Sequence, residues 1–299
     1  MAFNGQLLTT NEIKPPAWQS YVMAVLVRCV SANRPDLATD WATEAGGTLA
    51  FFTAPDDALL SGMCIVNDGG NAIVAFQGTS NTLQLLYQVL QAPQGQFTGI
   101  DGSVHGYYGS CFFERLATFQ ALIDSLPPTF NFFFTGHSAG GAIAHVAYRW
   151  FDQHENFNAL GAVTFGQPRT GNAYYAERTN PPFVRWIAQQ DFIPGLPPST
   201  FQAFSLIGPF ASTVLGLNYV HARAGWILNN DGSISPGYVN IIDLWGPPSP
   251  FPFSRLRAAW PAGYNAHALT NYVALLYVVA AAQGSPIDLA PFRAINALI

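Results

Sequence analysis

Residues 135–141 read Thr-Gly-His-Ser-Ala-Gly-Gly, and this stretch constrains the fold more than any other in the chain. An apolar run over 130–134 precedes it, and a run typical of a helix over 142–150 follows it directly. A Gly-x-Ser-x-Gly pattern between a buried strand and a helix predicts a tight, strained turn that exposes the hydroxyl of Ser138. The alternative is a glycine-rich turn whose serine only caps the next helix.

Strands and helices alternate around this turn. Apolar runs indicate three more buried strands, at 71–76, 161–165 and 183–187, and two helices, at 18–30 and 112–126. This alternation predicts an α/β fold in which a mainly parallel central sheet carries helices on both faces. Four residues lie just beyond the ends of predicted strands: Thr79, Ser138, Gly166 and Asp191. Because the chemistry of such sheets lies at the carboxyl ends of the strands, we expect these residues to converge.

The composition limits the kind of partner. The chain has 299 residues, which we interpret as a single domain over 1–299, and only 10% of them are charged. The net charge is -5 and the one lysine is Lys14, so no basic stripe is available for nucleic acid or for anionic lipid. The longest apolar run, 272–282, is shorter than the ~18 residues of a membrane span.

The cysteines and the N-terminal residues indicate which cellular compartment to expect for the protein. Cys29, Cys64 and Cys111 are odd in number and lack metal-site spacing, which predicts buried free thiols, with at most one disulfide as the alternative. Residues 1–14 have no basic segment followed by an apolar core, so we expect no signal peptide there. These observations favour the cytoplasm by default, and a secreted mature form stays open.

A serine nucleophile needs an imidazole that takes its proton and a carboxylate that orients the imidazole. On strand-to-helix turns of this kind the acid and then the histidine follow the serine in the chain. Four histidines precede the serine, adjoin it or lie on or just after the next helix: His105, His137, His145 and His154. Of the other two, His267 lies in a late loop before the C-terminal helix, so we predict it as the base. His221 is the alternative, with a hydrogen-bonded structural histidine as its other interpretation.

The predicted acid is Asp191. It follows the strand-like run that ends at residue 188 and precedes Phe-Ile-Pro, which indicates a rigid loop at the carboxyl edge. Its alternative role is to cap local amides. The other carboxylates have less suitable positions. Asp152 and Glu155 fall at the end of the helix after Ser138, Glu177 in a polar helical stretch, Asp231 in a turn and Asp243 after a strand-like run.

The negative oxygen that develops during acyl transfer needs backbone N–H donors. One comes from the residue after the nucleophile, here Ala139, and the second from a loop after an earlier strand. Thr79, just after strand 71–76, offers an amide and a hydroxyl. The alternative is a simple turn closed by Gly78. This chemistry requires no metal and no organic cofactor.

Several segments together resemble the class 3 lipase family, the fungal-type triacylglycerol lipases of α/β-hydrolase fold. The matching motifs occur in family order at 75–80, 104–107, 135–141, 164–172, 191–198 and around His267. Gly-Gln-Pro-Arg at 166–169 and Asp-x-x-Pro-x-Leu-Pro-Pro at 191–198 are much more specific than the serine turn. Two departures are Gln77, where an arginine that anchors the lid hinge is common, and Ala139, where leucine is usual.

The resemblance implies a serine carboxylic-ester hydrolase that cleaves acylglycerols, with a short helical lid beside the mainly parallel sheet. Residues 81–90 have apolar residues on one side, as expected of a lid that opens at a lipid–water interface, although an ordinary packed helix has the same pattern. The Pro-, Phe-, Gly- and Trp-rich region 195–263 indicates long loops or caps.

Two other functions stay open. One is an esterase for short-chain or aromatic, feruloyl-type esters, because the apolar stretches in 201–207 and 245–260 suit an acyl site and a packed core equally. The other is a catalytically silent, hydrolase-like binding protein, against which a triad in the right order argues. In each enzymatic case the partner is a small-molecule ester or a lipid.

Overall fold

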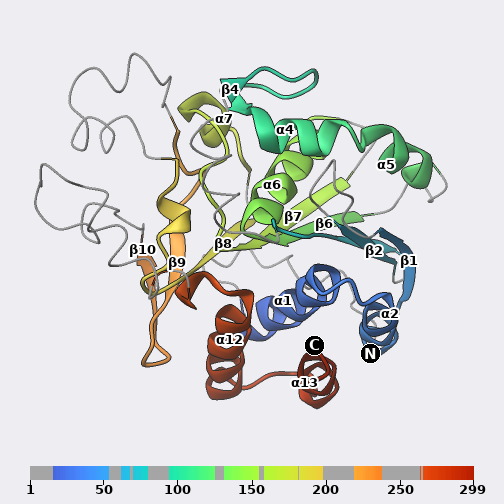
Figure 1. The fold of residues 1–299 in the computed structure, drawn as a ribbon, viewed down its shortest axis with the longest axis vertical. Coiled ribbons are helices and arrows are strands. Elements are labelled where there is room, and N and C mark those ends of the chain that lie inside the picture. The colour runs from blue at the N-terminus through green and yellow to red at the C-terminus, as the bar shows by residue number, and fades with distance from the viewer. Residues whose placement is uncertain are drawn as a thin grey trace, which may run out of the picture.

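The structure is a computed structural model, and it describes residues 16–53, 62–67, 70–79, 94–124, 131–154, 158–180, 182–197, 219–237, 263 and 265–299. Its centre is an eight-stranded sheet in the order β1-β2-β3-β6-β7-β8-β9-β10, seen almost edge-on in Figure 1. The strands are β1 (Thr48–Thr53), β2 (Met63–Asn67), β3 (Asn71–Phe76), β6 (Asn131–His137), β7 (Asn158–Phe165), β8 (Phe183–Ala188), β9 (Gly225–Leu228) and β10 (Ile234–Gly237). A separate pair joins β4 (Gln94–Gly95) and β5 (Val104–His105).

The middle of the sheet is parallel. β3 pairs with β6, β6 with β7, β7 with β8 and β8 with β9 in the same direction, whereas β1–β2, β2–β3 and β9–β10 are antiparallel. The central strands are buried almost throughout, as parallel strands between two helical layers must be. The predicted mainly parallel α/β sheet is confirmed.

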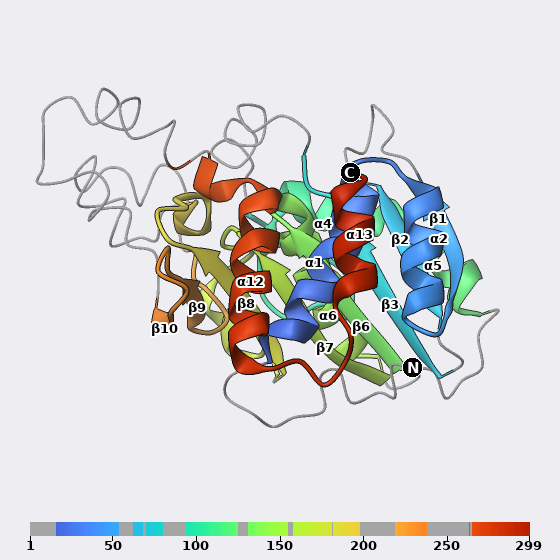
Figure 2. The same cartoon turned by 90° about the horizontal axis from the view of Figure 1, so that it is seen from below.

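Helices cover both faces, as Figures 1 and 2 show. One layer holds α1 (Ala17–Ser31), α2 (Pro35–Glu44), α12 (Leu269–Gln283) and α13 (Ala290–Ala297). The other holds α4 (Gly106–Phe113), α5 (Leu116–Ile123), α6 (Ala139–Asp152) and α7 (Ala173–Glu177). Each layer packs its own apolar cluster against the sheet. Among the described residues, no helix is long and apolar enough to cross a membrane.

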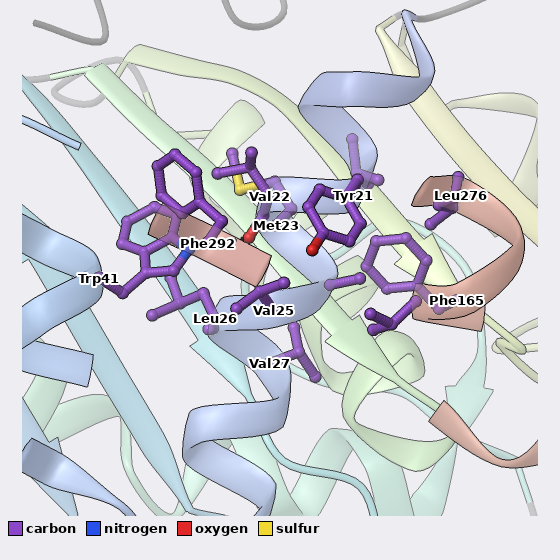
Figure 3. Close-up of a cluster of buried hydrophobic side chains, with 14 of the residues drawn as sticks. Tyr21, Val22, Met23, Val25, Leu26, Val27, Trp41, Phe165, Leu276 and Phe292 are labelled. Atoms are coloured by element: carbon purple, nitrogen blue, oxygen red, sulfur yellow. Dashed lines mark hydrogen bonds between the residues drawn. The ribbon is translucent and has the colours of Figure 1, made fainter. Parts of the chain in front are cut away.

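Helix α1 is the centre of the first layer. It is apolar on almost every side because it lies between the sheet and the helices α12 and α13, as Figure 3 shows. The Trp41 indole donates to the Val22 carbonyl at 2.9 Å and meets Phe292 edge-on. On the other side, the Trp186 indole of β8 donates to Ser20 Oγ at 2.7 Å. The Trp41 bond joins α2 to α1, and the Trp186 bond ties the strand that leads to Asp191 to α1.

Two expectations need correction. The apolar spacing over 112–126 predicts one helix, but α4 ends at Phe113 and α5 begins at Leu116. The turn between them lets the buried Arg115 reach Thr53 Oγ1 at 3.5 Å, a tertiary contact that apolar spacing does not encode. The region interpreted as loops or caps also contains the β9–β10 hairpin, which extends the sheet.

The expected lid and most of the expected cap region fall on residues that the structure does not describe, whereas the three cysteines are described. Residues 81–90, 198–218 and 238–262 lie outside the described residues, so the lid hypothesis and most of the cap region stay predictions. All three cysteines are buried and free, which confirms the expected thiols.

Candidate active site

Ser138 lies on the turn between β6 and α6 with φ 57° and ψ −127°, a left-handed conformation that few non-glycine residues adopt. The turn is closely packed. A side chain at Gly136 would collide with the carbonyl of Gly140, and one at Gly140 would collide with the carbonyl of Phe76. The Gly-x-Ser-x-Gly spacing therefore follows from the backbone contacts that the turn makes.

The structure brings together the three side chains that the sequence singled out. Ser138 Oγ lies 2.9 Å from His267 Nε2, and His267 Nδ1 lies 2.8 Å from Asp191 Oδ2. All three are buried, and Asp191 is fully so. Because the carboxylate accepts the Nδ1 proton, the neutral imidazole presents its unprotonated Nε2 to the serine. This is the arrangement that a serine nucleophile requires.

Asp191 is positioned by the end of β8. Its amide donates to the Ala188 carbonyl at 3.0 Å and closes a turn in which Gln190 has φ 73°. Its Oδ1 accepts the Ile193 amide at 2.9 Å. Its Oδ2 also accepts the Tyr272 hydroxyl at 2.5 Å. The motif around His267 includes the helix that contains Tyr272, but the sequence assigned no role to this residue, which lies in α12 five residues beyond His267.

Gly166 also contacts the triad, as its position after β7 predicted. It has φ 57°, and a Cβ there would lie 2.9 Å from Asp191 Oδ2 and 3.0 Å from His267 Nδ1. Both the conformation and the space require glycine. This glycine begins the Gly-Gln-Pro-Arg motif, so the specificity of that motif has a direct steric cause at the site.

The loop after β3 packs against the serine turn. A Cβ at Gly78 would lie 2.7 Å from the His137 carbonyl and 3.2 Å from Ser138 Cβ, so this loop approaches Ser138 as closely as backbone allows. The hydroxyl of Thr79 is buried and has no hydrogen-bond partner among the described residues. An unpaired buried hydroxyl costs about 1–3 kcal/mol, which marks a position where a ligand oxygen would be stabilising.

Gln77, which stands where the family commonly has arginine, is held by neutral hydrogen bonds. Its Oε1 accepts the Gly62 amide at 2.9 Å, and its Nε2 donates to the Ser31 carbonyl at 3.2 Å. The side chain thus ties the loop to the start of β2 and to the end of α1. The structure shows how this loop is anchored without a charge.

The remaining histidines make contacts elsewhere. His221 Nε2 lies 2.5 Å from the Pro194 carbonyl and 3.1 Å from Arg185, so the alternative base is engaged away from Ser138. His145 bonds Thr179 and Gln167, and His154 stacks on Trp150. His105 stacks on Tyr108. His137 packs against His267 itself.

The alternative acids are likewise elsewhere. Asp152 accepts from Asn180 at 2.8 Å, Asp231 accepts the Ser233 amide in an exposed turn, and Glu177 is exposed. Glu155 and Asp243 lie outside the described residues. Of the described carboxylates considered, Asp191 is the one bonded to His267.

His145 and His221 are two of the buried histidines that should make stability depend on pH. Burial and the charges of Arg149 and Arg185 lower the pKa of His145 well below 6.5, and burial with Arg185 and Arg169 does the same for His221. Both stay neutral in the folded protein but gain protons below about pH 6.5 once unfolded. Their contribution is therefore present above that pH and is lost as pH falls, by about 1.4 kcal/mol per pH unit for each group.

Urea unfolding checks this expectation. The free energy of unfolding should fall between about pH 7.5 and about pH 5.5, most steeply below about pH 6.5. A free energy that stays constant or rises over this interval would contradict the two neutral histidines.

The topology and the order serine, aspartate, histidine along the chain are those of an α/β-hydrolase. Residues 73–201, which include Thr79, Ser138, Ala139 and Asp191, match the family described as Lipase (class 3). The match covers less than half of the 299-residue chain.

Relatives and solved structures agree with that family. A lipase of Rhizopus niveus is 41% identical over 80 residues, covering 25% of this chain and 20% of the relative. The secreted mono- and diacylglycerol lipase 1 of Fusarium solani is 27% identical over 184 residues, covering 58% of this chain and 53% of the relative. The chain thus spans about half or less of the length of these curated relatives. The Rhizomucor miehei triacylglyceride lipase structure has a TM-score of 0.57 at 18% identity, covering 75% of this chain and 85% of that one.

Proposed function

We propose that this protein is a serine carboxylic-ester hydrolase that cleaves acylglycerols through an acyl-enzyme on Ser138. The observation that carries the proposal is the buried hydrogen-bonded chain from Asp191 through His267 to Ser138 Oγ. In water a serine hydroxyl is a weak nucleophile, and this chain supplies the base and the orienting charge that it lacks.

The geometry supports the usual order of acyl transfer. Ser138 Oγ attacks the ester carbonyl while His267 Nε2 takes its proton. His267 then gives that proton to the leaving alcohol, and Asp191 stabilises the transient imidazolium. Water enters, loses a proton to His267 and hydrolyses the acyl-enzyme by the same route. Each proton moves between atoms that are already within hydrogen-bond distance or that the substrate brings there.

We assign the binding of the oxyanion to two residues, Ala139 and Thr79. The Ala139 amide begins α6, directly after Ser138, and the Thr79 loop packs against the serine turn. We propose that the Thr79 amide and its unpaired buried hydroxyl both face the developing charge. A donor in such a position typically contributes about 3–4 kcal/mol to transition-state stability.

The substrate class rests on the relatives. The two curated relatives are a lipase and a mono- and diacylglycerol lipase, and the structural relative is a triacylglyceride lipase. We therefore propose lipid esters at a lipid–water interface as the substrates, with the chain acting as a single domain and 81–90 as the candidate lid.

Hydrolysis of a chain-length series tests this function. The protein should hydrolyse p-nitrophenyl esters from acetate to palmitate as well as emulsified triolein, and Ser138 should be labelled by a fluorophosphonate. Hydrolysis restricted to dissolved short or aromatic esters would replace the lipase with an esterase. Absence of both labelling and hydrolysis would leave a binding protein.

A further inference from the structure

The hydrogen bonds around Tyr272 direct its hydroxyl proton to the carboxylate of Asp191. Its oxygen accepts the Ala188 amide at 2.9 Å and lies 2.5 Å from Asp191 Oδ2. A phenol has one proton, and the carboxylate has none to give. Because the Ala188 N–H points at the oxygen, the phenol proton must point at Asp191. Burial and the charge of Asp191 raise the pKa of Tyr272 well above 10.0, so the phenol keeps this proton.

His137 holds the base from the other side. Its Nε2 lies 2.7 Å from the carbonyl oxygen of His267, so Nε2 carries a proton and donates it. Its ring lies 4.7 Å from the ring of His267 and 5.7 Å from that of Tyr272, centroid to centroid. Burial and the charge of His267 lower the pKa of His137 well below 6.5, so it acts as a neutral donor.

We propose that Tyr272 and His137 are positioning residues that together brace the triad. Tyr272 fixes the carboxylate of Asp191, and His137 fixes the backbone of His267 to the turn that carries Ser138. The inference rests on the proposed function, since it explains how the same three side chains stay aligned. Neither residue needs to touch the substrate.

Removing the Tyr272 bond to Asp191 and removing the His137 bond to the His267 carbonyl should affect the pH dependence of activity differently. The Tyr272 hydroxyl spreads part of the negative charge of Asp191, so its removal leaves more charge facing His267 and favours the charged imidazole. Among the described residues, the His137 ring also lies 5.7 Å from the Tyr272 ring, centroid to centroid, and the charge of Arg185 slightly opposes the rise in the pKa of Tyr272. The His137 bond goes to a backbone carbonyl, so its removal should loosen the loop without changing that charge.

Tyr272→Phe tests the first bond, because it removes the hydroxyl and keeps the ring. We expect kcat on p-nitrophenyl butyrate to fall about 10- to 100-fold, as for loss of a hydrogen bond to a charged group, with KM little changed. The acid limb of the kcat/KM profile should move to higher pH. Tyr277→Phe, on the same helix with its hydroxyl near Arg293, is the matched control and should behave as wild type. An acid limb that does not move overturns the role of Tyr272, whatever happens to kcat.

A pair of substitutions tests the second bond. His137→Phe keeps a ring against His267 but removes the donor, whereas His137→Gln restores an N–H at a similar reach. We expect kcat to fall about tenfold in the first variant and to recover in the second, with the acid limb in place. His154→Phe, whose ring stacks on Trp150, is the control. Equal losses in the Phe and Gln variants would overturn the role of the His137 bond.

A readout independent of turnover separates this inference from the proposed function. The downfield proton resonance of His267 Nδ1–H reports its bond to Asp191 directly. It should shift in Tyr272→Phe and stay in place in Tyr277→Phe, even if wild type hydrolyses no ester. An unchanged resonance in Tyr272→Phe overturns the brace, whereas a wild type without hydrolysis or fluorophosphonate labelling overturns only the enzyme assignment.

Discussion

Replacing Ser138 by alanine is expected to lower kcat on p-nitrophenyl butyrate by about 10⁶-fold, the cost of removing a serine nucleophile from an intact triad. The loss follows because Oγ is the atom that His267 Nε2 faces at 2.9 Å. Folding should survive, since alanine accepts the same left-handed backbone at about the same cost as serine and fills no new space.

Rates and circular dichroism measured on the same samples check this result. Ser110→Ala, an exposed serine on α4, is the matched control and should keep wild-type turnover. Substantial ester hydrolysis by a folded Ser138→Ala protein would mean that another group carries the reaction.

Asp191→Asn is expected to lower kcat by about 10⁴-fold, as in other Ser-His-Asp triads, with a smaller effect on KM. Three donors converge on the two oxygens of Asp191, from Ile193 N–H, His267 Nδ1–H and the Tyr272 hydroxyl. An amide has only one acceptor oxygen, so at least one donor must face an NH₂ group. If that donor is His267, the imidazole takes the wrong tautomer and Nε2 no longer accepts the serine proton.

Steady-state kinetics of this variant should be compared with Asp231→Asn, which changes a carboxylate in an exposed turn. The control should retain wild-type kcat, because its carboxylate is exposed and, among the described residues, bonds locally to Ser233. A loss smaller than about tenfold in Asp191→Asn would argue that another carboxylate orients His267.

The serine turn was predictable because every constraint on it is local. Gly136 and Gly140 lie within two residues of Ser138, and the apolar strand and helix on either side have their own periodicity. The chain order then led to Asp191 and His267, which the structure places in hydrogen-bond contact. These features need no knowledge of which strands are neighbours.

Other elements depend on contacts that no local pattern encodes. The break between α4 and α5 accompanies a contact between Arg115 and Thr53, which are far apart in sequence. The β9 strand is short and becomes a strand by pairing with β8. Apolar spacing alone describes the first segment as a continuous helix and the second as a loop.

The sequence by itself determined the elements around Ser138, the alternation that produces a parallel sheet, and the three side chains that are proposed as the triad. Only the tertiary structure decided what supports them. Tyr272 and His137 reach Asp191 and His267 because α12 packs beside β8 and the serine turn, across 81 and 130 residues of chain. Backbone turns and apolar periodicity are written in neighbouring residues, whereas the partners of a buried polar group are set by which elements the folded core brings together.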